Sequence, residues 1–212
     1  MIYPRSRLCV DSTLLLLLRR PATDAFRHCG LQAGAKPVTN QLPYNLLYRG
    51  IESGILPASA AKGMGVLCYS PLQQGLLTGR FTKSEDVPEG RRRTRLFAGD
   101  STPKSRHGGP GAEPELFAAI AALQAVADST GGEVSMVDLA IGWLLAQPGV
   151  SCLLVGASTP EQATRNAKIP AVPAELLEKC TQATEALRLA SDPIIDPYGT
   201  VSRIHGNERP AQ

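Results

Sequence analysis

Several patterns that would point directly to a function are absent from this sequence of 212 residues. There is no Gly-x-Gly-x-x-Gly and no Walker-type Gly-Lys-Ser/Thr, so neither of these nucleotide-binding loops is present. No apolar run is long enough to span a membrane. Aromatic residues make up only 5% of the chain and the net charge is only +3, which argues against a surface for nucleic acid.

The cysteines and histidines are too scattered for a disulfide scaffold or a metal site. The five cysteines are odd in number and include no Cys-x-x-Cys pair, a usage that suits a reducing compartment. The three histidines lie far apart and show no His-x-x-x-His spacing. We therefore predict a cytoplasmic protein without a metal ion.

The amino-terminal residues 1–25 are unassigned. Leu14–Leu18 has arginines on both sides, which faintly resembles a targeting sequence, although Asp11 interrupts the segment and no clean small-residue cleavage site follows. An unstructured or incorrectly assigned amino end is the favoured interpretation, and an organelle-targeting peptide is the alternative. Residues 206–212 are predicted to form a short tail.

The most informative segments are 65–80 and 151–166, because each changes abruptly from an apolar run to Gly, Ser, Thr and Pro. The apolar runs predict strands that are buried on both faces. In the second segment Thr159 is a good N-cap, Pro160 suits the first helical turn and Gln162 completes a capping box. A helix that begins where a strand ends offers free N–H groups to an anion. Two such places suggest a ligand with more than one phosphate, although most strand–helix joints bind nothing.

The chain as a whole alternates strands with helices, which predicts parallel βα units. Ser135 and Asp138 resemble a capping box that opens a helix, and Gly63 suits the position just after a helix. The stretch 81–111 is rich in Gly, Pro, Ser and Arg, and an irregular stretch of this length is usually functional or disordered. The predicted strands are 37–43, 65–70 and 152–155, and the predicted helices are 47–62, 114–129, 136–147, 160–167 and 173–189.

Four segments of the chain, in the same order and at sensible spacing, resemble segments of one known family. They are Asn-Gln-Leu-Pro-Tyr-Asn-Leu-Leu at 40–47, Tyr-Ser-Pro-Leu-Gln-Gln-Gly-Leu-Leu-Thr-Gly-Arg at 69–80, Trp-Leu-Leu-Ala-Gln-Pro-Gly-Val at 143–150 and Gly-Ala-Ser-Thr-Pro-Glu-Gln-Ala-Thr-Arg-Asn at 156–166. In these segments, and over residues 26–205 as a whole, the chain resembles the C-terminal part of aldo-keto reductases.

The resemblance implies an α/β fold related to the (β/α)₈ TIM barrel. Such a barrel has eight strands and typically about 250 residues, whereas three strands are visible here. We therefore expect an incomplete (β/α)₈ barrel, made of roughly the last three βα units and the accessory helices. An incomplete barrel exposes a sheet edge, which offers a route to self-association.

The resemblance also implies NADP(H) as the cofactor and assigns residues to it. Gln41 matches the residue that hydrogen-bonds the nicotinamide carboxamide, and Tyr69 matches the aromatic residue that stacks on the nicotinamide ring. The residues that match the family's loop around the pyrophosphate are Ser70, Pro71, Leu72 and Gly75, and Arg80 matches a residue that contacts a phosphate. The residues that match the adenosine side are Gly156, Ser158, Gln162 and Asn166.

Five further arginines bear on the cofactor. Arg165 stands where the family commonly has Glu, and we hypothesise that it strengthens attraction to a 2′-phosphate. The loop arginines Arg91–Arg93 and Arg95 have two interpretations. A solvated loop is the favoured one; in the other, one of these arginines reaches the phosphates of the cofactor, because Arg is suited to bidentate phosphate contacts.

The catalytic Tyr, Lys, Asp and His that the family carries on its early strands have no counterpart here, since Tyr44, Tyr48 and Tyr69 match positions with other roles. Reduction of a carbonyl by hydride needs a proton donor for the forming alkoxide. The resemblance thus implies the cofactor-binding half of an NAD(P)H-dependent reductase, inactive alone and acting on a small carbonyl compound only if the other half is supplied. The alternatives are a non-catalytic nucleotide-binding or regulatory half-barrel, and a non-functional truncated product.

Overall fold

The computed structural model describes residues 37–191 and 197–199, in which three parallel strands form one sheet. The strands are β1 (Thr39–Pro43), β2 (Gly65–Tyr69) and β3 (Val150–Leu154), hydrogen-bonded in the order β1-β2-β3. The predicted α/β class with parallel strands is confirmed. Within the described residues the sheet is open, with β1 and β3 at its edges. The predictions for 1–25 and for the tail 206–212 lie outside the described residues.

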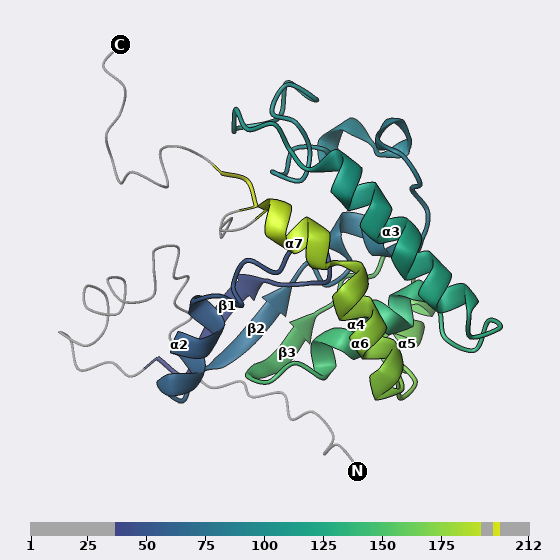
Figure 1. Cartoon of the computed structure of the whole chain (residues 1–212). Coiled ribbons are helices and arrows are strands. Elements are labelled where there is room, and N and C mark those ends of the chain that lie inside the picture. The colour runs from purple at the N-terminus through teal and green to yellow at the C-terminus, as the bar shows by residue number, and fades with distance from the viewer. Residues whose placement is uncertain (1–36, 192–196, 200–212) are drawn as a thin grey trace.

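Most of the helices pack against one another or against the sheet (Figure 1). They are α2 (Ile55–Ala61), α3 (Glu113–Asp128), α4 (Met136–Leu145), α5 (Pro160–Asn166), α6 (Ala174–Ala183) and α7 (Glu185–Ser191), with short 3-10 helices at Gln73–Thr78, Ser84–Asp86 and Glu89–Arg91. Helix α3 contacts α4, α6 and α7, and α4 also contacts β3. Ser135 and Asp138 form the predicted capping box of α4, and Gly63 adopts a left-handed conformation just after α2.

The sheet has one buried face and one face that is largely open. The buried face carries Asn40, Leu42, Val66 and Cys68, whereas the open face carries Gln41, Leu67, Tyr69, Cys152 and Leu154. The prediction that the strands are buried on both faces is wrong, most clearly for β3, where Leu154 is 43% exposed. The reason is that the helices of the described part cover one face of the sheet, so alternate side chains of each strand point into the open.

The helix predicted at 47–62 begins later than expected, at Ile55. The side-chain oxygen of Asn45 accepts a hydrogen bond from the backbone N–H of Leu47 at 2.9 Å, which competes with helix formation. Leu47 and Ile51 are still buried, but through consecutive turns. The apolar spacing of 47–62 thus reflects burial of these side chains, although turns and not a helix bury the first of them.

Two further segments differ in detail from their predictions. The helix predicted at 173–189 is interrupted at Thr184, whose hydroxyl donates to the carbonyl oxygen of Cys180 at 3.1 Å and whose φ of −106° ends α6. The stretch 81–111 is irregular, as predicted, but it is packed: Phe81 and Phe97 are among its residues that lie in the core. This packing holds the stretch beside the loop that follows β2.

Cys152 is expected to react with Ellman's reagent much faster than Cys68 or Cys180. Burial raises the pKa of both Cys68 and Cys180 to about 12, so at about pH 8 almost none of either thiol is in the reactive thiolate form. Cys152 is exposed on the open face of the sheet. With Cys9 and Cys29 replaced by serine, we expect a single fast thiol before denaturation. Further fast thiols, or a fast phase that survives Cys152→Ser, would contradict this description of the sheet.

Candidate functional site

The loop after β2 has an unusual backbone, which Asn45 holds in place. Among the described residues, the non-glycine residues with positive φ are Ser70, Gln73 and Gln74, all in this loop, and Gly75 follows at φ 95°. The buried Asn45 donates through Nδ2 to the carbonyl oxygen of Ser70 at 2.9 Å and to Oε1 of Gln73 at 2.8 Å. Such conformations persist where the surroundings enforce them, often at functional sites. Sequence reasoning gave Asn45 no role, although it stands just after a strand in the first of the four motifs.

The turn after β3 leads into the short helix α5. The hydroxyl of Thr159 accepts a hydrogen bond from the backbone N–H of Gln162 at 3.3 Å, so the predicted N-cap is present. The predicted capping box needs a correction, because the Gln162 side chain accepts from the N–H of Ser158 at 2.9 Å and not from that of Thr159. Asn166 donates through Nδ2 to the carbonyl oxygen of Gly156 at 3.3 Å. Gln162 and Asn166 thus both brace the turn that precedes their own helix.

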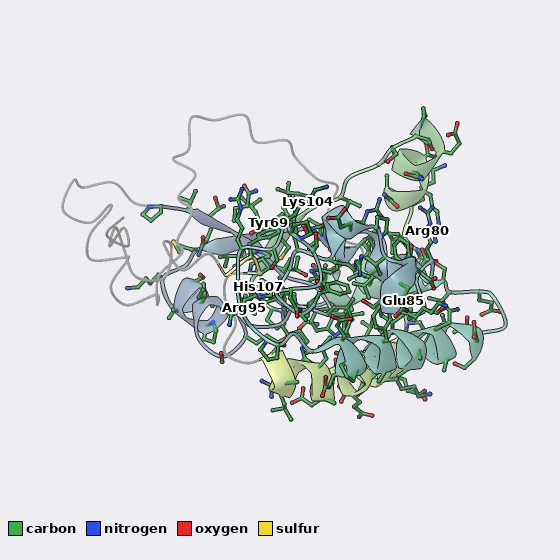
Figure 2. All side chains as sticks on the ribbon, turned by 90° about the horizontal axis from the view of Figure 1, so that it is seen from above. Tyr69, Arg80, Glu85, Arg95, Lys104 and His107 are labelled. Carbon is green, nitrogen blue, oxygen red and sulfur yellow. The ribbon has the colours of Figure 1, made fainter. Side chains whose placement is uncertain are left out.

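These two loops, which follow β2 and β3, meet at an open cavity of about 740 Å³. A volume of this size is typical of sites for small molecules and cofactors. All the predicted site residues except Gln41 and Tyr69 line it, namely Ser70, Pro71, Leu72, Gly75, Arg80, Gly156, Ser158, Gln162 and Asn166. Gln41 and Tyr69 lie instead on the open face of the sheet, on the neighbouring strands β1 and β2 (Tyr69 is labelled in Figure 2).

The lining of this cavity carries positive charge. It includes Arg80, Arg91 and Arg165 but no aspartate or glutamate. Arg91 belongs to the packed stretch 81–111, and its guanidinium lies 5.8 Å from the centre of the Phe81 ring. Of the four loop arginines considered in the sequence, Arg91 is the one that lines the cavity. No role in the site was predicted for the other lining residues, which are Gln74, Thr78, Val137, Leu154 and Val155.

Tyr44 is poorly suited to donate a proton in a reaction at neutral pH. Its ring is fully buried, and its hydroxyl donates to Oε1 of Glu52 at 2.8 Å. Burial raises the pKa of Tyr44, and the negative charge of Glu52 raises that pKa further. A catalytic acid needs a pKa close to the working pH, so a shift in this direction opposes such a role.

Two negative findings apply to the described ranges, 37–191 and 197–199. No three of their His, Cys, Asp and Glu side chains gather in a way that could hold a metal ion. No helix within these ranges is both long and apolar enough to cross a membrane.

Similar proteins include both reductases and channel subunits. A putative voltage-gated potassium channel subunit beta of Schizosaccharomyces pombe is 33% identical over 150 residues, which are 68% of this chain and 39% of that protein. An L-glyceraldehyde 3-phosphate reductase of Escherichia coli O157:H7 is 32% identical over 163 residues, 74% of this chain and 41% of that protein. An NADH-specific methylglyoxal reductase of Escherichia coli K12 is 30% identical over 127 residues, 59% of this chain and 35% of that protein.

The matched region therefore spans about two fifths of the length of these curated relatives. The sequence model of the Aldo/keto reductase family matches residues 22–184 of this chain. That match covers the three strands, the cavity-lining loops and most of the helices. The chain belongs to the aldo/keto reductase family, whose members are NAD(P)H-dependent oxidoreductases.

Proposed function

We propose that this chain forms the NADP(H)-binding part of an aldo-keto reductase, built from roughly the last three βα units of a (β/α)₈ barrel. Residues 26–205 would make up this part, with 1–25 left unassigned. The cavity carries the proposal, because two loops far apart in the sequence converge on it and its lining includes three arginines and no carboxylate. A dinucleotide with two or three phosphates matches that charge.

The residues present fit a nicotinamide dinucleotide. Arg80 and Arg91 are suited to the pyrophosphate oxygens, and the irregular backbone of Ser70–Gly75 resembles the turns that present N–H groups to anions. Gln162 and Asn166 offer amide groups for the adenine side. Gln41 and Tyr69 would bind the nicotinamide from the open face of the sheet. The bound cofactor would supply the hydride for a carbonyl compound.

We further propose that residues 1–212 do not reduce carbonyl compounds by themselves. The sequence lacks the family's catalytic Tyr, Lys, Asp and His motifs, and the burial of Tyr44 argues against a substitute acid. A small carbonyl substrate would be reduced only with those residues supplied by further polypeptide. The edges at β1 and β3 are where further strands, or a second copy of this chain, would pair.

A non-catalytic nucleotide-binding role is the second candidate. It is supported by the similarity to a putative channel subunit and by a cavity suited to phosphates in a chain that lacks the catalytic motifs. This role and the reductase fragment both predict cofactor binding, whereas a non-functional truncated product predicts none. A stable fold without additional polypeptide would favour the regulatory role, and gain of turnover on adding the remaining barrel segments would favour the reductase.

Calorimetric titration of the purified chain with NADPH tests the proposal. We expect saturable binding at a micromolar level, with NADH titrated in parallel to measure the preference for the 2′-phosphate. A folded, soluble sample that binds neither dinucleotide would overturn the proposal. In the same buffer, an aromatic aldehyde should cause no oxidation of NADPH, and clear turnover would show that the chain is catalytic as it stands.

A further inference from the structure

Helix α5 forms one wall of the cavity, yet it is weakly embedded in the molecule. None of its residues is buried, and all except Asn166 are exposed. Seen from above, α5 projects from the body of the protein on the side where Arg80 lies (Figure 2). The lining residues Gln162, Arg165 and Asn166 are all on this helix. The shape of the cavity therefore depends on the contacts that join α5 to the body.

Arg165 makes such a contact. Its Nη2 donates to the hydroxyl oxygen of Ser135, and the same nitrogen lies 3.6 Å from Oδ2 of Asp138. Asp138 is only 13% exposed, and it is held in turn by the backbone N–H of Ser135 at 2.9 Å. Arg165 also lines a second cavity of about 300 Å³, so its side chain stands between the two cavities.

We infer that Arg165 is a positioning residue, which bridges α5 to the Ser135–Asp138 capping box and so holds Gln162 and Asn166 ready for the adenine side of the dinucleotide. The inference rests on the proposed function of the cavity. A wall that is ordered before binding spares the ligand the entropic cost of ordering it. Because the Arg165 side chain is about half exposed, the bridge should contribute less than about 1 kcal/mol. Its loss would change the Kd for NADPH, or the equilibrium for opening of α5, by up to about three- to fivefold.

The Asp138→Asn and Arg165→Gln variants distinguish this indirect role from direct contact with a phosphate. If the bridge matters, each variant should raise the Kd for NADPH, by up to about three- to fivefold, and the double variant should bind no more weakly than Arg165→Gln, because Asp138 acts on α5 only through Arg165. Asparagine keeps an oxygen that can accept the Ser135 N–H. A Kd that stays unchanged or falls in Asp138→Asn, while Arg165→Gln raises it, would overturn the inference and favour a direct phosphate contact.

Hydrogen exchange of the ligand-free protein tests the bridge without relying on NADPH. In Asp138→Asn the sequence of α5 is unchanged, and its amides should exchange about three- to fivefold faster than in the unmodified chain. Equal exchange would overturn the bridge. The amides at 140–145, inside α4, should keep their exchange rates, which shows that the capping box still functions.

A matched control is Lys168→Gln, which removes a positive charge just beyond α5. Lys168 is exposed and does not line either cavity, so we expect no change in exchange or in the Kd for NADPH. A response equal to that of Arg165→Gln would attribute the effect to net charge and overturn the bridge. If exchange changes as expected but no variant binds NADPH, the bridge is supported and the proposed function of the cavity fails.

Discussion

Reversing the charge of both Arg80 and Arg91 is expected to weaken NADPH binding by about a hundredfold or more. Both guanidinium groups line the cavity, and no carboxylate there competes for them. A hydrogen bond to a charged group contributes about 1.5–3 kcal/mol, so losing two of them multiplies the Kd by more than about one hundred. Calorimetry on the Arg80→Glu/Arg91→Glu double variant measures this effect.

The matched control for that experiment is Lys104→Glu with Arg106→Glu. This double variant changes the net charge by the same amount, and both residues are exposed and outside the cavity lining. Salt screens charges beyond about 8 Å at physiological ionic strength, so the Kd should change less than about threefold. Equal weakening in both double variants would mean that the overall charge of the protein attracts the ligand. If neither double variant binds NADPH more weakly, the phosphates do not bind in this cavity.

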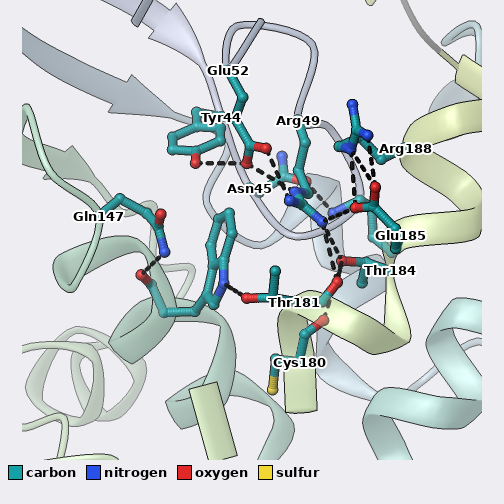
Figure 3. Close-up of polar contacts among 12 residues, drawn as sticks. Tyr44, Asn45, Arg49, Glu52, Gln147, Cys180, Thr181, Thr184, Glu185 and Arg188 are labelled. Carbon is teal, nitrogen blue, oxygen red and sulfur yellow. Dashed lines mark hydrogen bonds and ion pairs between the residues drawn. The ribbon is translucent and has the colours of Figure 1, made fainter. Parts of the chain in front are cut away.

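Replacing Arg49 with alanine is expected to lower the free energy of unfolding by about 2–3 kcal/mol, less than for a fully buried ion pair, because the Glu52 side chain stays 24% exposed. Arg49 is only 7% exposed and connects the turn after β1 to the end of α6 (Figure 3). It donates to both carboxylate oxygens of Glu52, at 2.8 and 2.9 Å, and to the carbonyl oxygen of Thr181 at 3.2 Å. Its guanidinium also lies 5.7 Å from the centre of the Trp143 ring. Truncation removes the Arg49 donor from Oε2 of Glu52, while Oε1 keeps its hydrogen bond from the Tyr44 hydroxyl.

Urea denaturation followed by the fluorescence of Trp143, the one tryptophan of the chain, measures this loss. Arg188→Ala is the control, because Arg188 pairs with Glu185 within α7 at a more exposed position and should cost less than about 1 kcal/mol. Arg49→Lys should fall between the two, since lysine lacks the planar fork of donors. An Arg49→Ala variant as stable as Arg188→Ala would show that this network contributes little.

Sequence reasoning succeeded where the physical cause is local. A capping box needs only Ser135, Asp138 and the backbone between them, and it is present. The chain has a positive φ just after α2, and glycine suits that position because a residue with a side chain would be strained there. The three strands were placed within two residues of their observed ends, since a short apolar run between turn residues is a strong local signal.

The errors arose where side-chain hydrogen bonds and the packing of the described helices, which an apolar pattern does not reveal, decided the backbone or the burial. Apolar spacing at 47–62 indicated one helix, but the Asn45 side chain and burial of the turns after it shortened the helix. The apolar run of β3 indicated burial on both faces, whereas the described helices cover one face of the sheet. A continuous helix at 173–189 was expected, yet the hydroxyl of Thr184 bonds back to the Cys180 carbonyl where the chain turns into α7.

The sequence by itself determined the α/β class, the family and the two cofactor-like loops, because order and residue type along the chain are enough for these. It could not show that Arg91, among four loop arginines, lines the cavity. Nor could it show that Arg165 pairs with Asp138, or that Asn45 holds the loop after β2. Those features depend on side chains brought together from distant segments, and such proximity is decided by the packing of helices and strands.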